Sequence, residues 1–87
     1  MTLVEWIEAE YPDEEILIAE GFDGAFIGVG PVPGGEHVAI YDEAKCIEIL
    51  MSRDGMDHDE ALEFFEFNVT GAYVGPGTPM FITRFTP

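Results

Sequence analysis

The chain has 87 residues, of which 18 are acidic and three are basic, so its formal net charge at pH 7 is −15. Hydrophobic residues make up 47% of the chain, which is enough to build a core and excludes a disordered acidic tail. The length accommodates a single domain, residues 1–87. The scarcity of Lys and Arg argues against direct binding to nucleic acid, which requires cations that replace phosphate counterions.

The cysteine content and the start of the chain bear on where the protein acts. Cys46 is the single cysteine, so no internal disulfide can form, and a reducing cytoplasm is favoured. Residues 1–6 lack the basic start and apolar run of a signal peptide, and no apolar stretch approaches about 18 residues. We therefore expect a cytoplasmic protein without a membrane partner.

The first half of the chain predicts one helix and two strands. A capping box at Thr2 and Glu5 with helical spacing of apolar residues predicts a short helix that ends before Pro12. The apolar run 16–19 is too short to separate strand from helix by periodicity, and we favour a strand or an irregular buried segment. After a turn at 21–24, the β-type segments 25–30 and 37–41 flank a Gly- and Pro-rich connection, which predicts an antiparallel hairpin.

The second half predicts a helical hairpin and a third strand. Asp42 provides an N-cap for a helix to about Arg53, and Asp57 provides the next N-cap, for a helix that ends at Gly71. Strand propensity returns over 80–85. The fold class is therefore α+β: a small antiparallel sheet of about three strands packed against a helical hairpin, with a short N-terminal helix.

A distinctive string of residues extends over nearly the whole chain, in Gly21–Asp23, Ala25–Gly30, Tyr41–Asp42, Lys45–Met51, Arg53–Met56, Glu60–Ala61, Phe65–Gly75 and Thr78–Pro79. It resembles a family of small acidic proteins that are encoded by bacteriophages and found in viral metagenomes, with no established function. The resemblance implies a phage protein that acts in the cytoplasm of a bacterial host. It implies no activity, ligand or catalytic residue.

Two motifs resemble ligand-binding sites, but turns and helix caps explain both motifs better than ligand binding does. The Gly-rich segment 28–35 lacks the Lys and Ser/Thr of a phosphate-binding loop, so a hairpin turn explains it. Four acids crowd one turn at Asp54, Asp57, Asp59 and Glu60. Their spacing departs from the EF-hand loop, so helix capping and solvation explain them, with a weak Ca²⁺ or Mg²⁺ contact as the alternative.

The residues with potential for catalysis are scattered. Cys46 lies inside a predicted helix, His37 follows a loop, and His58 falls in the first turn of the third helix. These positions favour structural or surface roles over a nucleophile with its base or a metal site. Carboxylate pairs are uninformative among so many acids, so we expect no enzymatic activity, no metal and no cofactor.

The acidic residues and one aromatic cluster are the candidate binding sites. Solubility is the simplest explanation of the acids, and a negative face that steers a basic protein is the functional one. The partner-binding candidates are Glu5, Glu8, Glu10, Asp13, Glu14, Glu15, Glu60, Glu63 and Glu66. The stripe on the third helix is typical of a buried core, and its alternative is a pocket in which aromatic rings stack on a planar ligand. The pocket candidates are Phe64, Phe67, Asn68 and Tyr73.

These observations predict a non-enzymatic phage accessory protein that binds and inhibits a host macromolecule, namely a basic nucleic-acid-associated or defence protein. The alternative is a protein that binds or sequesters a small ligand such as a nucleotide signal, although only Lys45, Arg53 and Arg84 provide cationic donors. The C-terminal strand, with polar residues beside Phe81 and Ile82, predicts a sheet edge that can pair with a second copy into a homodimer.

Overall fold

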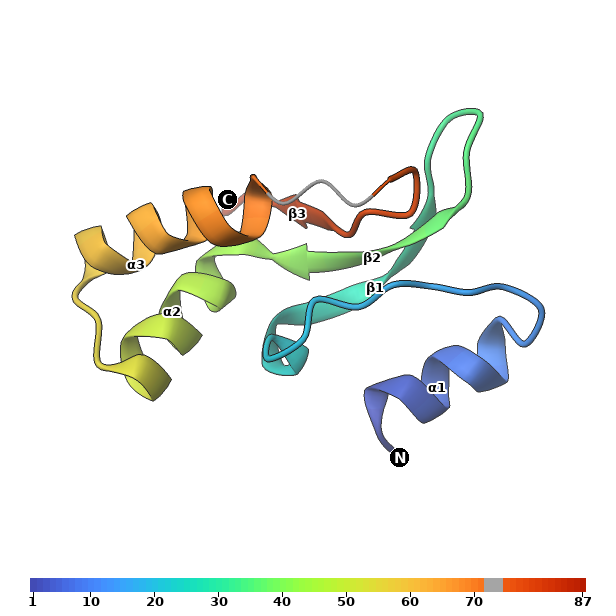
Figure 1. Ribbon diagram of the computed structural model, residues 1–87, viewed down its shortest axis with the longest axis horizontal. Helices are drawn as coiled ribbons and strands as arrows, with labels where there is room; N and C mark the ends of the chain where they lie inside the picture. Colours follow the sequence, from blue (N-terminus) through green and yellow to red (C-terminus); the bar gives the residue numbers. More distant parts are fainter. Residues whose placement is uncertain (72–74) are drawn as a thin grey trace.

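The computed structural model describes residues 1–71 and 75–87 (Figure 1). Within these ranges the elements follow in the order α1 (Leu3–Glu10), the 3₁₀ turn η1 (Asp23–Ala25), β1 (Phe26–Pro31), β2 (His37–Asp42), α2 (Glu43–Asp54), α3 (His58–Phe65), the π-helical turn η2 (Glu66–Thr70) and β3 (Met80–Ile82). The predicted α+β class is confirmed, with its short N-terminal helix and its helical hairpin.

Helix α1 forms through the predicted capping box. The Glu5 backbone N–H donates to Thr2 Oγ1 at 3.2 Å, and the Thr2 N–H donates to Glu5 Oε1 at 2.9 Å. The hydrogen bond from the Thr2 backbone N–H, with a smaller one from its side chain, lowers the pKa of the Glu5 carboxyl. Ile7 is buried, and the Trp6 ring meets the Phe26 ring edge-on at 5.9 Å between centroids. The helix therefore packs on the start of β1, away from the α2–α3 hairpin (Figure 1).

The apolar run 16–19 is an irregular segment, as one of the two expected structures has it, but it is only partly buried, and Leu17 is 37% exposed. The Ala19 N–H donates a hydrogen bond of 2.8 Å to the hydroxyl of Tyr41, whose side chain is fully buried in the core. Burial raises the pKa of the Tyr41 phenol, so its hydroxyl keeps its proton. This bond fastens the segment between α1 and β1 to the sheet.

The sheet has the strand order β1-β2-β3, and its third strand corrects the prediction. β1 and β2 form the predicted antiparallel hairpin, with a register irregularity between Phe26 and Gly28. β3 pairs with β2 in parallel, from Ile40 opposite Met80 to Asp42 opposite Ile82, so the sheet is mixed and not wholly antiparallel. The segment after the helical hairpin brings Gly77 beside Glu36, next to the start of β2, so β3 runs in the same direction as β2.

β3 is also shorter than the predicted strand over 80–85. Its partner β2 ends at Asp42, where α2 begins, so Thr83 and the residues beyond it have no strand to pair with. Arg84 instead turns toward that junction, and its Nε lies 2.8 Å from Asp42 Oδ2.

The two hairpin helices start and stop where the sequence predicts. Asp42 Oδ1 accepts from the Lys45 N–H at 3.2 Å at the start of α2, and Gly55 ends that helix in the left-handed conformation at φ 69°. Asp57 and Glu60 form a capping box on α3, with N···O distances of 2.8 and 3.2 Å. The π-helical turn then continues the helix to Thr70, just before the predicted end at Gly71.

The helical hairpin and the sheet share one hydrophobic core. The Phe81 ring stacks on Tyr41 at 5.4 Å and meets Phe65 of α3 edge-on at 5.2 Å. Leu50 and Cys46 from α2 are fully buried in the same cluster. No helix in the described ranges is both long and apolar enough to cross a membrane.

Candidate functional site

The nine predicted partner-binding acids are all exposed, and they fall into three groups. The first group lies on α1, the second on the segment after it and the third on α3 and the start of η2. These groups are Glu5, Glu8 and Glu10; Asp13, Glu14 and Glu15; and Glu60, Glu63 and Glu66. The second group, and Glu60 and Glu63 of the third, line concave surfaces, which makes them the stronger candidates.

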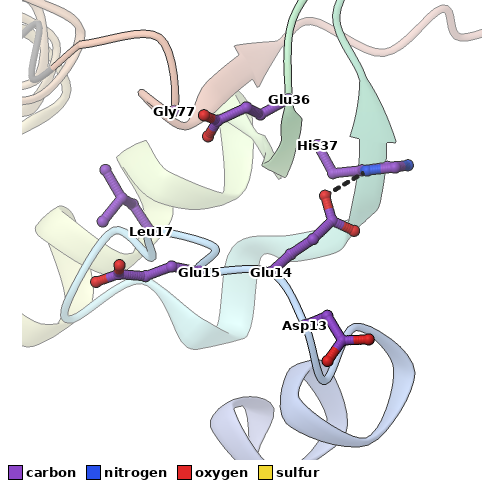
Figure 2. Close-up of a pocket in the computed structure, with 7 residues that line it drawn as sticks. All are labelled: Asp13, Glu14, Glu15, Leu17, Glu36, His37 and Gly77. Atoms are coloured by element: carbon purple, nitrogen blue, oxygen red, sulfur yellow. Dashed lines mark hydrogen bonds and ion pairs between the residues drawn. The ribbon is translucent and has the colours of Figure 1, made fainter.

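The second group lines a hollow of about 500 Å³, shown in Figure 2, that we call the acidic hollow. Three segments that are far apart in the sequence build it: the irregular stretch after α1, the start of β2 and the turn before β3. Its lining residues are Asp13, Glu14, Glu15, Leu17, Glu36, His37 and Gly77. Four carboxylates therefore line one concave surface.

Local contacts hold the segment after α1 against the start of β2, and these two segments carry the carboxylates of the hollow. The Glu14 N–H donates to the Tyr11 carbonyl at 3.2 Å, which turns the chain after Pro12. The Tyr11 ring packs on the His37 ring at 5.1 Å between centroids, and His37 Nδ1 lies 2.8 Å from Glu14 Oε1. In Figure 2 Glu14 reaches toward His37, while Glu36 extends toward Gly77.

The remaining carboxylates of the hollow have no counterion. Within the described ranges, the side chains of Asp13, Glu15 and Glu36 take part in no hydrogen bond or ion pair, and the lining contains no Lys or Arg. Carboxylates around a concave, low-dielectric surface focus a negative potential that attracts cations. In the described ranges no three His, Cys, Asp or Glu side chains are placed to hold a metal ion.

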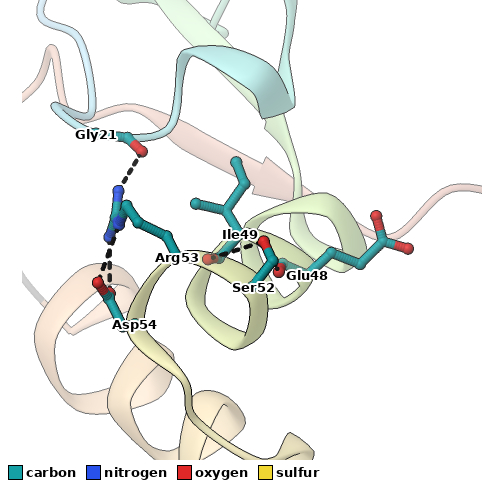
Figure 3. Close-up of polar contacts among 6 residues, drawn as sticks. All are labelled: Gly21, Glu48, Ile49, Ser52, Arg53 and Asp54. Atoms are coloured by element: carbon teal, nitrogen blue, oxygen red, sulfur yellow. Dashed lines mark hydrogen bonds and ion pairs between the residues drawn. The ribbon is translucent and has the colours of Figure 1, made fainter.

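Two of the three cationic side chains are occupied elsewhere. Arg53 donates to the Gly21 carbonyl at 2.7 Å and forms two hydrogen bonds, of 2.9 and 3.1 Å, with the Asp54 carboxylate (Figure 3). These bonds with Arg53 lower the pKa of the Asp54 carboxyl. Arg84 pairs with Asp42. The single lysine of the chain does not line the hollow either, so none of the three Lys and Arg side chains neutralises its carboxylates.

Glu60 and Glu63 of the third group line a second concave surface of about 420 Å³ on α3 and η2, which we call the aromatic groove. Its lining residues are Met56, Glu60, Glu63, Phe64, Phe67 and Asn68. Three of the four predicted pocket residues thus lie together, and the fourth, Tyr73, lies outside the described residues. The structure merges the predicted pocket with the predicted acidic edge, apart from Glu66, which does not line the groove.

Helical spacing explains which aromatic side chains face outward. Ala61 and Phe65, four residues apart, are buried against the core, whereas Phe64 is 39% exposed and Phe67 is 76% exposed. Asn68 Nδ2 donates to the Phe64 carbonyl at 3.2 Å, which leaves its side-chain oxygen available as an acceptor. The predicted core stripe on this helix is therefore only partly buried.

The potential catalytic residues lie on different elements. Burial raises the pKa of the Cys46 thiol to about 12, with smaller contributions from the carboxylates of Asp42 and Glu43, so the thiol stays protonated. His58 is exposed at the start of α3, with Nδ1 3.8 Å from Asp59 Oδ1, and His37 belongs to the acidic hollow.

Glu36 and His37 are the site residues that sequence reasoning missed. In the sequence, Glu36 falls in the hairpin connection, and His37 lies far from the other residues that line the hollow. Both residues lie at the end of the predicted hairpin loop, and this position is the one sequence feature that could have marked them. The sequence does not show that this loop folds back beside residues 13–15.

Comparison of the chain with protein-family models, with curated proteins and with solved structures gives no match.

Proposed function

We propose that this protein binds a basic host protein through its acidic surfaces and inhibits it without catalysing a reaction. The observation that carries the proposal is the acidic hollow, in which Asp13, Glu14, Glu15 and Glu36 line one surface with no Lys or Arg among the lining residues. A Lys- or Arg-rich surface supplies the missing positive charge, and complementary charge speeds association.

The class of partner follows from the same chemistry. Proteins that bind nucleic acid present clusters of Lys and Arg to phosphates, and a compact body with a net charge of −15 offers those clusters an alternative anion. The resemblance to phage-encoded acidic proteins supports a nucleic-acid-associated or defence protein in the cytoplasm of the bacterial host. Occupying its basic surface would block the function of that partner.

The alternative, binding of a nucleotide signal, is favoured by one feature and opposed by another. The exposed rings of Phe64 and Phe67 could stack on a base. Glu60 and Glu63 line the same groove, which has no Lys or Arg in its lining and would repel phosphates. A thermal-shift screen with cyclic dinucleotides and ADP-ribose derivatives tests this alternative, and no shift at saturating ligand eliminates it.

The proposal is tested by neutralising the hollow at constant shape. The triple variant Asp13→Asn, Glu15→Gln, Glu36→Gln is compared with a control of equal net charge, Glu20→Gln, Glu48→Gln, Asp59→Asn. These control positions are exposed and lie outside the hollow and the groove. Affinity for a 20-residue poly-L-lysine is measured by calorimetry at several NaCl concentrations, with poly-L-glutamate as the negative control.

We expect the hollow variant to bind poly-L-lysine about tenfold more weakly than the control variant, because three charge contacts contribute about 0.5 kcal/mol each. Affinity should also fall steeply as salt rises. Equal losses in both variants would show that net charge alone attracts the polycation and that the hollow has no special role. Affinity purification from host cells at low and high salt then identifies the partner.

A further inference from the structure

We infer that the aromatic groove is a binding site for a guanidinium group, the side chain of an arginine on the basic partner. This inference rests on the proposed function and names the residue type that the partner inserts. It starts from the face formed by Glu60, Glu63, Phe64 and Phe67, which lie at positions i, i+3, i+4 and i+7 along α3 and η2.

The groove combines exposed aromatic rings with carboxylates, and few kinds of ligand bind both at once. Phe67 is 76% exposed and Phe64 is 39% exposed, so two aromatic rings are accessible to solvent. Glu60 and Glu63 flank these rings in the same concave surface. An apolar segment that covered the rings would also remove these carboxylates from water without compensation, which is costly. A phosphate-bearing ligand would meet two negative charges.

The acceptors in the groove are available. Glu60 uses Oε1 to accept the Asp57 N–H at 3.2 Å, and within the described ranges its Oε2 has no partner. The Glu63 side chain likewise takes part in no hydrogen bond or ion pair in those ranges. Asn68 offers its side-chain oxygen, because its nitrogen donates to the Phe64 carbonyl. Acceptors thus surround the two rings.

A guanidinium matches this arrangement better than an ammonium does. It is planar and weakly hydrated, so it stacks on an aromatic face, and its five N–H donors can reach carboxylates at the same time. An ammonium is a compact and strongly hydrated charge, which loses more hydration for the same contact. The sulfur of half-buried Met56 adds a polarisable surface at the groove. The geometry thus favours arginine over lysine.

The test compares two peptides of equal charge, (Gly-Arg)₅ and (Gly-Lys)₅, by ¹⁵N NMR titration and calorimetry at about 50 mM NaCl. The variant Phe67→Ala removes the exposed ring, and Phe85→Ala is the matched control, because Phe85 is 89% exposed and does not line the groove. Far-UV circular dichroism confirms that each variant is folded.

We expect the arginine peptide to bind about threefold to fivefold more tightly than the lysine peptide, with shift changes over residues 56–68. Phe67→Ala should abolish this preference, and Phe85→Ala should preserve it. Equal affinities for the two peptides, or a preference that survives Phe67→Ala, would overturn the guanidinium site. The proposed function would still stand if both peptides bind and the hollow variant weakens them, whereas it would fail with the site if neither peptide binds.

Discussion

The side chain of Asp42, at the end of β2, contacts both the start of α2 and the C-terminal segment. It is only 5% exposed, and it accepts the Lys45 N–H at the start of α2 and pairs with Arg84 at 2.8 Å. The sequence predicts the first contact, because a helix cap is local. It does not predict the second, because the C-terminal segment reaches Asp42 only once β3 has paired beside β2.

Cys46 is buried, and burial raises the pKa of its thiol to about 12. We expect iodoacetamide at pH 8 to modify the native protein about a hundredfold more slowly than the protein in 6 M guanidinium chloride, because the reactive thiolate forms only after opening. Mass spectrometry measures the modified fraction over time. Equal rates in the two conditions would show that the thiol is accessible in the native state.

The same pKa shift fixes the sign of a pH effect on stability. An unfolded thiol loses its proton near pH 8.5, while the folded one keeps it to about pH 12. The contribution of this thiol to the free energy of unfolding is therefore complete below about pH 8.5 and is lost as the pH rises toward 12.

As with the contacts of Asp42, the sequence indicates those site residues that are neighbours in the chain but not those that the fold brings together. Asp13, Glu14 and Glu15 are adjacent in sequence, and their charge marks them as a candidate surface. Glu36 and His37 join them only because the β1–β2 hairpin brings its loop back to the segment after α1. Periodicity and capping signals carry no information about such a return.

At the scale of elements, the helices were the easiest to predict and the third strand the hardest. Thr2, Asp42 and Asp57 each cap a helix as their sequence context indicates. Strand propensity over 80–85 predicts a strand but carries no direction, and the three paired residues of β3 are too few for a pattern that separates parallel from antiparallel pairing. The direction of β3 depends on where the helical hairpin delivers the chain.

Gly55 ends α2 in the left-handed conformation at φ 69°, so the helical hairpin depends on its backbone freedom. We expect Gly55→Ala to lower the free energy of unfolding by about 1 kcal/mol, measured by urea denaturation. An added Cβ would meet no atom within 4 Å, so the loss comes from the backbone alone.

Gly28→Ala is the control for this prediction. Gly28 lies in β1 without a positive φ, and its added Cβ also has open space. We expect a change within about 0.5 kcal/mol, or a slight gain in stability. Equal losses at the two positions would show that the left-handed conformation is not the cause.

At the scale of the whole molecule, the net charge of −15 opposes the compact state. The fold spans 40 × 30 × 29 Å, so most of its carboxylates lie within a few Debye lengths of one another at low salt. We expect the melting temperature to rise by about 5 °C between 10 and 300 mM NaCl, equivalent to about 1 kcal/mol, in calorimetric scans.

The control for the salt effect is the variant with Glu20, Glu48 and Asp59 neutralised, which should show a smaller rise because less repulsion remains to be screened. A melting temperature that is constant or falls as NaCl is added would contradict the idea that repulsion between carboxylates limits the stability of this fold.

Helix α3, which carries much of the aromatic groove, and the segment that follows α1, which lines the acidic hollow, lie toward opposite sides of the molecule (Figure 1). The molecule is 40 Å long, a length that about 12 residues span in extended form, so a single partner chain that filled both sites would need at most about that many residues between them. The overall affinity would then exceed that of either contact alone. Once one site is occupied, the rest of the partner chain is held at a high local concentration beside the other site. Under the proposed function, a partner whose basic residues form one small cluster would gain nothing from this spacing, whereas an elongated basic segment would gain the most.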